Sequence, residues 1–253
     1  MGIKLSICGK GGSGKSTLTG LMAQQAAARS YKIIVVDSDE SNSGLYRTLG
    51  FEKPPVSLMN LVGGKQTLKG NMRQTNILRN EKISIADIPQ QYKVSHNGVH
   101  LVSIGKITHA FEGCACPMGV LNREFLKKLD LGEKEIALID MEAGIEHFGR
   151  GIDAEIDGIL LVVEPSFESL SIATKIKEIA GSFHKRLWAV INKVRSEQMK
   201  KQLVDTLKKD AIEVIGAIPD DPVVFRAGLE GKAIGSCEAA HAAGKILDHW
   251  IKL

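Results

Sequence analysis

The sequence of 253 residues has few aromatic side chains, few cysteines and no long apolar stretch. Phe, Trp and Tyr together make up 5 % of it, and it contains four Cys. Four cysteines in a chain of this length are too few for a scaffold built on disulfides. The longest continuous apolar run that looks buried, Ile159 to Val163, is far shorter than the roughly 20 residues of a membrane helix. We therefore expect no stable membrane association.

An excess of charge of one sign is also lacking. The chain has 33 Lys and Arg against 29 Asp and Glu, a net charge of +4, and no arm or tail carries the excess. A nucleic-acid-binding protein usually gathers basic charge on one face, so we expect no nucleic-acid partner. Glycines and lysines interrupt the N-terminal segment MGIKLSICGKGG, unlike a secretory signal. We expect a cytoplasmic protein whose thiols are reduced.

Short runs rich in Ile and Val alternate with amphipathic stretches. The predicted strands are Lys4–Cys8, Lys32–Val36, His100–Ile104, Glu135–Ile139, Gly158–Val163, Leu187–Ile191 and Glu213–Ile218. The predicted helices are Ser16–Arg29, Val120–Leu129, Phe167–Phe183, Ser196–Lys209 and Glu238–Ile251. This alternation predicts an α/β fold of three layers, a mostly parallel twisted sheet with helices on both faces. We expect residues 1–253 to form one domain that binds its ligand at the carboxyl ends of the strands.

A glycine-rich loop follows the first predicted strand and precedes a helix. Its sequence, Gly9-Lys10-Gly11-Gly12-Ser13-Gly14-Lys15-Ser16-Thr17, is the pattern G-x-x-x-x-G-K-[ST] of P-loop NTPases. Glycines let backbone N–H groups converge on a polyphosphate at the helix N-terminus. We therefore predict a P-loop NTPase that binds ATP or ADP through residues 11–17. Lys15 should reach the β- and γ-phosphates, and the Ser16 hydroxyl should ligate Mg²⁺.

A second lysine, Lys10, stands directly after the first glycine of the loop. The resulting KGGxGK[ST] sequence resembles the deviant P-loop of the MinD, ParA, nitrogenase iron protein and ArsA ATPases. In that family this lysine crosses a dimer interface to the partner's nucleotide. The resemblance implies that ATP holds two copies of the chain face to face. It also implies a catalytic Lys10, which adds positive charge where phosphoryl transfer develops negative charge.

Acidic residues follow two further strands, where they would meet the phosphate site. The segment Val36–Asn42 resembles the family's switch I, and Asp39 falls on its catalytic acidic position, which places the attacking water. Asp37 is the alternative, because it too could face the metal. Asp140 ends a later apolar strand, which is the position of the acid that holds Mg²⁺ through a water molecule in P-loop NTPases. Alternatively, Asp140 could cap a helix. Gly144 can bring a backbone N–H near the γ-phosphate.

Two dipeptides after later strands resemble the family's contacts with the adenine base. They are Asn192-Lys193 and Pro219-Asp220. An Asn side-chain amide can both donate to and accept from the adenine edge. We expect all four residues to bind the nucleotide.

The loop after the third predicted strand contains Cys114 and Cys116, flanked by Gly113 and Pro117. Cysteines two residues apart are poorly placed for a disulfide, but their thiolates can share a metal. Two thiolates fill half of a tetrahedral site, so two such loops in an ATP-bound homodimer would supply four sulfurs. Such a soft site suits Zn²⁺ or Ni²⁺.

Together, the P-loop, the Cys114-x-Cys116 loop and the segment from Asp140 to Gly151 resemble the CooC-type accessory ATPases of carbon monoxide dehydrogenase. The resemblance implies a homodimer formed on ATP or metal binding, nickel at the cysteine pair, and carbon monoxide dehydrogenase as the acceptor. The alternatives are an iron–sulfur cluster carrier ATPase and a MinD- or ParA-type positioning ATPase that acts on membrane or DNA. The roles of His109 and His147 stay open.

Other features have structural interpretations. Cys8, at the end of a strand, and Cys237, near the start of the last helix, are expected to be structural. The last helix carries Ile246, Leu247 and Trp250 at helical spacing, and we expect it to pack into the core.

Overall fold

The computed structural model describes residues 2–41, 44–64, 67, 78–106, 116–145, 148 and 152–252. The strands are β1 (Ile3–Gly9), β2 (Lys32–Asp37), β3 (Val94–His96), β4 (Val99–Ser103), β5 (Glu135–Asp140), β6 (Gly158–Val163), β7 (Arg186–Val194) and β8 (Glu213–Pro219). The helices are α1 (Lys15–Ala28), α2 (Leu45–Thr48), α3 (Leu58–Leu61), α5 (Cys116–Lys128), α6 (Phe167–Ser182), α7 (Glu197–Lys209), α8 (Pro222–Glu230) and α9 (Glu238–Trp250). Short 3-10 helices cover Gln90–Tyr92 and Ile152–Glu155.

The described strands form one sheet in the order β3-β4-β2-β5-β1-β6-β7-β8. All neighbours are parallel except β3 and β4, which form an antiparallel hairpin. Every residue of β6 is buried, as expected for a strand with helices on both faces. The prediction of a mostly parallel sheet is confirmed, and each of the predicted strands is present.

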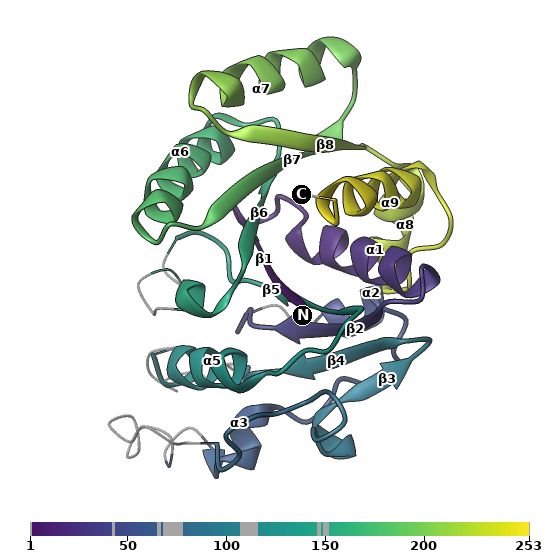
Figure 1. The fold of residues 1–253 in the computed structure, drawn as a ribbon. Helices are drawn as coiled ribbons and strands as arrows, with labels where there is room; N and C mark the ends of the chain where they lie inside the picture. Colours follow the sequence, from purple (N-terminus) through teal and green to yellow (C-terminus); the bar gives the residue numbers. More distant parts are fainter. Residues whose placement is uncertain are drawn as a thin grey trace.

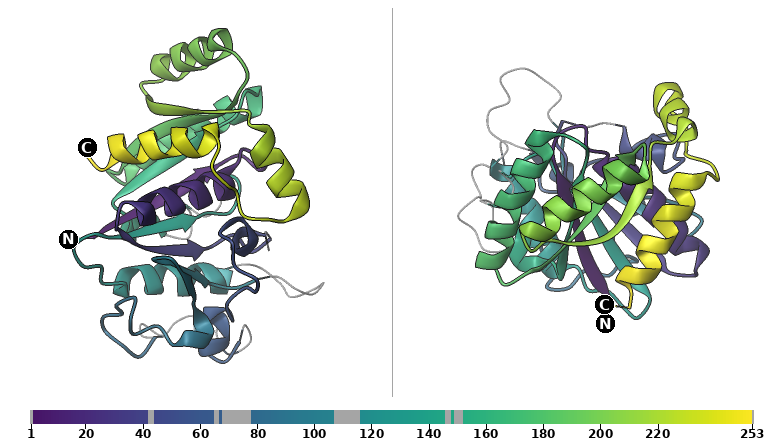
Figure 2. Two further views of the ribbon diagram at one scale, coloured as in Figure 1. Left: turned by 90° about the vertical axis from the view of Figure 1, so that its right-hand side faces the viewer. Right: turned by 90° about the horizontal axis from the view of Figure 1, so that it is seen from above.

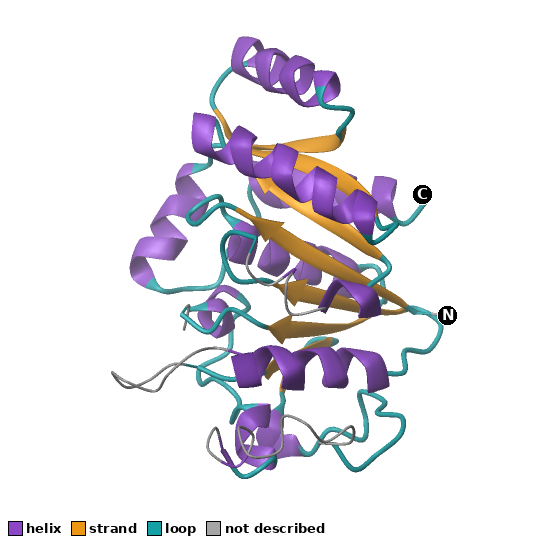
Figure 3. Ribbon diagram, turned by 90° about the vertical axis from the view of Figure 1, so that its left-hand side faces the viewer, coloured by secondary structure: helices purple, strands orange, loops and turns teal. Residues whose placement is uncertain are grey.

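Helices cover both faces of this sheet (Figure 1). Side chains of α5, α6 and α7 pack into one apolar layer, around residues such as Phe125, Ile176 and Leu207. Side chains of α1 and α9 pack into the layer on the other face, which α2 and α8 complete. Figures 2 and 3 show the same sandwich from three further directions. The three layers expected from the sequence are confirmed.

Helix starts follow the capping chemistry of the sequence. Ser166 and Ser196 accept hydrogen bonds from the N–H groups of Ser169 and Met199, and so cap α6 and α7. Cys237 caps α9 in the same way, through its sulfur, which confirms a structural role. In α9, Ile246, Leu247 and Trp250 are at most 5 % exposed. The last helix is therefore a core helix, as expected.

Three of the described helices, α2, α3 and α8, are absent from our sequence predictions, and the longest of them is α8. It has a capping Asp221, a proline at its first position, and Gly231 in the left-handed conformation at its end. These are the standard start and stop signals of a helix, and they could have revealed it. Helix α8 directly follows the segment Pro219-Asp220, so it sits at the carboxyl edge of the sheet.

Candidate nucleotide site

The glycine-rich loop connects β1 to α1 at the carboxyl edge of the central strand. Gly12 and Gly14 adopt positive φ angles of 78° and 98°, which side chains rarely allow. A Cβ at Gly14 would also lie 2.1 Å from Nδ2 of Asn192. The Ser13 N–H closes the loop by donating to the Lys10 carbonyl at 3.1 Å. Gly11 and Gly12 are exposed, so a polyphosphate can approach their backbone.

The predicted magnesium ligands meet at the base of this loop. The Ser16 hydroxyl donates to Oδ2 of Asp140 at 2.6 Å, and the Thr19 hydroxyl lies 3.4 Å from Oδ1. Asp140 is completely buried and no helix starts there, so the interpretation as a helix cap is wrong. Burial, together with the nearby charge of Asp37, raises the pKa of Asp140 to about 7.

Asp37 is opposite Asp140 in the pairing of β2 with β5. Burial raises the pKa of Asp37 to about 6, although Lys106 Nζ, 2.7 Å from its Oδ2, opposes that rise. Two buried carboxyl groups whose pKa values are raised by burial therefore lie next to a serine hydroxyl, with Lys106 as the cation paired with Asp37. The donor set of hydroxyl and carboxylate oxygens suits Mg²⁺. The residues present therefore fit this ion.

Asp39 lies one residue beyond Ser38 and is buried. Its Oδ1 accepts from the N–H and the hydroxyl of Ser41 at 2.9 and 2.7 Å. Its carbonyl accepts from Lys106 Nζ at 2.5 Å. Lys106 thus binds both Asp37 and Asp39, a role that our sequence analysis missed. Beside this segment, a cavity of about 880 Å³ is lined by Ser16 and Asp37 and by the basic Lys106, Arg47 and Lys232.

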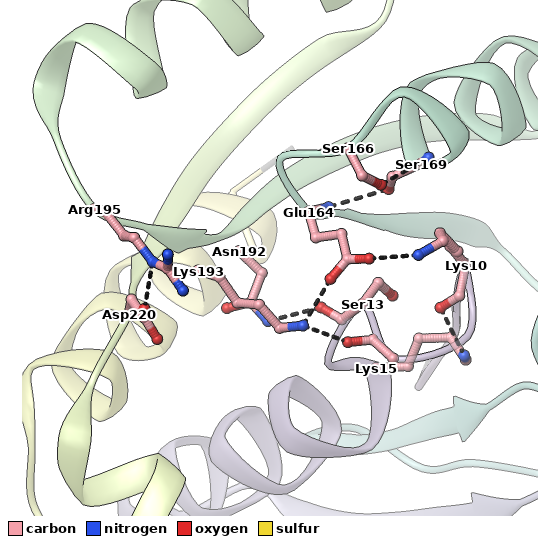
Figure 4. A network of polar contacts seen from close by, with 11 residues as sticks. Lys10, Ser13, Lys15, Glu164, Ser166, Ser169, Asn192, Lys193, Arg195 and Asp220 are labelled. Atoms are coloured by element: carbon pink, nitrogen blue, oxygen red, sulfur yellow. Dashed lines mark hydrogen bonds and ion pairs between the residues drawn. The ribbon is translucent and has the colours of Figure 1, made fainter.

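Lys10 is held within its own chain. Its Nζ donates to Oε1 of Glu164 at 2.8 Å, while Lys193 Nζ donates to Oε2 of the same carboxylate at 2.6 Å (Figure 4). The two lysines lower the pKa of Glu164 against the effect of its partial burial. The hydrogen bond to Glu164 raises the pKa of Lys10. Glu164 follows β6 as Asp140 ends β5, so the pattern of an acid at a strand end could have identified it.

Two of the four residues predicted to contact the base bind the glycine-rich loop. Asn192 Nδ2 donates to the Ser13 carbonyl at 2.8 Å, and Lys193 Nζ donates to the Gly12 carbonyl at 2.7 Å (Figure 4). Asp220, after Pro219, accepts from Arg195 Nε at 2.8 Å instead. The structure therefore brings Asn192 and Lys193 to the phosphate loop, and it holds Asp220 in a surface ion pair.

Two further predicted residues have partners of their own. The Gly144 N–H donates to the Gly9 carbonyl at 3.2 Å, so it must leave that bond to reach a γ-phosphate. Lys15 Nζ lies 3.3 Å from the Lys10 carbonyl. Both contacts lie within the P-loop region, where an incoming phosphate would compete with them.

The predicted soft-metal site lies outside the described residues. Cys114, His109 and His147 belong to the segments that are not described, as does the side chain of Cys116. Among the described residues, no group of three or more His, Cys, Asp or Glu side chains is placed to hold a metal. Cys8 is fully buried, which confirms that it is structural. In the part of the chain that the structure describes, no helix is long and apolar enough to cross a membrane.

Comparison with known proteins identifies the family. The model of the CobQ/CobB/MinD/ParA nucleotide-binding domain matches residues 6–234. The chain belongs to this family. It is a P-loop ATPase of the MinD/ParA type.

Three similar proteins illustrate the range of the family. An uncharacterized ATP-binding protein of Methanocaldococcus jannaschii is 39 % identical over 92 % of this chain and 94 % of its own length. The carbon monoxide dehydrogenase accessory protein CooC of Rhodospirillum rubrum is 32 % identical over 90 % of this chain and 88 % of its own. The structure of the septum site-determining protein MinD of Pyrococcus horikoshii, complexed with Mg-ADP, superposes with a TM-score of 0.74. It is 18 % identical and covers 100 % of this chain and 97 % of its own.

Proposed function

We propose that this ATPase is a nickel-handling chaperone for the nickel–iron–sulfur cluster of carbon monoxide dehydrogenase. In this proposal ATP pairs two chains, and Cys114 and Cys116 of each chain bind one shared metal ion. The similarity to CooC over nine-tenths of the chain supports this function. So does the cysteine pair, for which a positioning ATPase has no use.

One observation carries the link between nucleotide and metal. The stretch from Lys106 to Asn122 contains both cysteines, and the residues at its two ends are hydrogen-bonded to segment 37–39 at the end of β2. Before the cysteines, Lys106 binds Asp37 and the Asp39 carbonyl. After them, Asn122 of α5 donates to the Ser38 hydroxyl at 2.9 Å. A change in segment 37–39 on ATP binding would therefore act on both ends of the segment that holds Cys114 and Cys116.

The chain's own residues divide the work of the ATPase cycle. The P-loop amides and Lys15 hold the phosphates, and Ser16 and Asp140 would hold the magnesium ion, which neutralises phosphate charge. Asp39 orients the attacking water. Lys10 leaves Glu164 and reaches the partner's nucleotide, so pairing requires the exchange of one anionic partner for another. Hydrolysis releases the γ-phosphate and so weakens the contact of Lys10 with the nucleotide. The dimer then loosens and releases the metal to the acceptor.

Sedimentation velocity with and without Ni²⁺ and a non-hydrolysable ATP analogue tests the proposal. Because binding equilibria are reciprocal, metal that prefers the dimer must favour ATP-induced pairing, and ATP must favour metal binding. We expect the largest dimer fraction with both ligands, and a nickel titration that ends near one metal per two chains. Equal dimer fractions in all four conditions would contradict the proposal.

A pair of variants separates the metal site from the nucleotide site. Cys114→Ala combined with Cys116→Ala should abolish nickel binding and leave nucleotide binding unchanged. Cys237→Ala, which removes a half-buried thiol from the cap of α9, is the matched control and should still bind nickel. Tight nickel binding by the double variant would refute the assignment. A brown protein with cluster absorbance after anaerobic purification would favour an iron–sulfur carrier instead.

A further inference from the structure

The described sheet ends in two edges of different character. At one end, the edge strand β3 has only three residues, of which Ser95 and His96 are exposed, and it pairs with β4 in a hairpin. At the other end, β8 has seven residues and, among the described strands, pairs with β7 alone (Figure 1). A long edge strand presents unpaired main-chain groups that another chain can bind. Proteins usually protect such an edge with a charged residue or a proline within the strand.

Strand β8 carries such residues only at its two ends, Glu213 and Pro219. Its pairing with β7 also shifts in register between Ala189 and Val190 and between Ile191 and Val194. From Val214 to Ile218 it contains no charged residue, and Val214, Ile215 and Ala217 are only half-buried. Pro219 stands at the very end of the strand. The strand residues form part of the lining of a groove of about 700 Å³. At about 3.3 Å per residue, seven residues span about 23 Å, enough to pair with a segment of similar length.

Basic side chains line the walls of this groove. Helix α7 contributes Lys200, and the exposed face of α9 contributes His241, Lys245 and His249. Glu238, at the start of α9, is the one acidic residue among the described lining residues. Lys200 is in part engaged by Glu197, at 3.2 Å on the exposed surface of α7. The groove therefore combines an apolar strand edge with one lysine on each wall, Lys200 of α7 and Lys245 of α9.

From this combination we infer that β8 docks an extended, acidic segment of a partner protein by strand addition. The partner's main chain would pair with the edge of β8, and its carboxylates would face Lys200 and Lys245. A second copy of the chain fits poorly, because an antiparallel β8–β8 pair would bring the same lysines of both copies together. A nucleic acid would meet no Phe, Tyr or Trp side chain among the described lining residues on which its bases could stack.

The test uses a synthetic octapeptide that alternates Glu with Val and Thr, and fluorescence anisotropy with the full-length protein. A peptide of the same length with Lys in place of Glu is the charge control. We expect the acidic peptide to bind with a dissociation constant below about 1 mM, and to slow the hydrogen exchange of amides in residues 213–219. The basic peptide should not bind.

Charge-reversal variants locate the binding. Lys200→Glu with Lys245→Glu should weaken binding of the acidic peptide by about tenfold or more. Lys201→Glu with Lys209→Glu reverses two exposed lysines of α7 outside the groove lining and should leave binding within about twofold. Unchanged ATP binding by both double variants confirms that they fold. Equal peptide affinities of the two variants, no peptide binding at about 1 mM, or binding of oligothymidylate in preference to the peptide would each overturn the inference.

Discussion

Replacing Asp140 by Asn should stabilise the protein without nucleotide while removing one of its two proposed magnesium-holding residues. Asp140 is completely buried beside Asp37, and its pKa rises from an ordinary 3.8 to about 7. At pH values above 7 the folded protein must hold this charge in a site where ionisation is unfavourable. A rise of that size corresponds to about 4 kcal/mol. Because Asp37 titrates with Asp140, we expect a gain of about 2–4 kcal/mol for Asp140→Asn at pH 8.

The pH dependence has a definite sign. Below pH 3.8 the Asp140 carboxyl is neutral in both the folded and the unfolded chain, so its ionisation costs nothing. Between pH 3.8 and about 7 the folded protein binds more protons than the unfolded chain, and its stability falls as the pH rises. Above pH 7 the cost is complete. The stabilisation by Asp140→Asn should therefore be less than half as large at pH 5 as at pH 8.

Urea unfolding without nucleotide at pH 5 and pH 8 measures this effect. Trp188 and Trp250 are 7 % and 5 % exposed, so their fluorescence reports unfolding of the core. Asp205→Asn, which neutralises an exposed carboxylate on α7, is the control and should change the stability little at either pH. A variant at Asp140 that is less stable than the wild type at pH 8, or equally stabilised at both pH values, would refute the reasoning.

Three further substitutions test the polar network of the site. Glu164→Gln should free Lys10 and raise the dimer fraction with an ATP analogue severalfold in sedimentation velocity, whereas Glu168→Gln, which removes a nearby exposed carboxylate, should change it little. Asn192→Ala removes a buried hydrogen bond to the phosphate loop and should cost about 1–2 kcal/mol of ADP binding, measured by calorimetry. Lys106→Met should abolish the effect of ATP on nickel affinity and leave nickel affinity without ATP unchanged; a retained ATP effect would argue against this coupling.

The strands were predictable because they are buried on both faces and therefore read as continuous apolar runs. The predicted Gly158–Val163 agrees at both ends with β6. Helix α5 begins at Cys116, whereas the prediction began at Val120. The prediction missed the first turn of the helix because that turn lacks the apolar spacing of the rest. The hairpin of β3 could not be predicted, since three residues of mixed polarity carry no periodic pattern.

The phosphate loop was predictable because a polyphosphate demands glycines and a lysine at fixed spacing. The position of Glu164 at a strand end could have marked it as a candidate, but its pairing with Lys10 was not predictable. The two residues are 154 apart in sequence and meet only because β6 lies beside β1. The same holds for Asn192, which we predicted from the family resemblance to contact the base. Its amide reaches the Ser13 carbonyl only because β6 and β7 bring it there. The order of the strands in the sheet therefore decides which residues become hydrogen-bond partners at the site, and sequence motifs do not give that order.

The nucleotide-free site already satisfies many of its own charges, and this explains how a bound nucleotide can act as a switch. Glu164 takes the place of a phosphate for Lys10 and Lys193, and the Gly9 carbonyl takes the Gly144 N–H. The buried acids are the exception, since burial raises the pKa of Asp140 to about 7. Binding of magnesium and nucleotide would relieve the acids and at the same time compete for the lysines. The two changes act on opposite sides of the P-loop, so a single ligand can reorganise both.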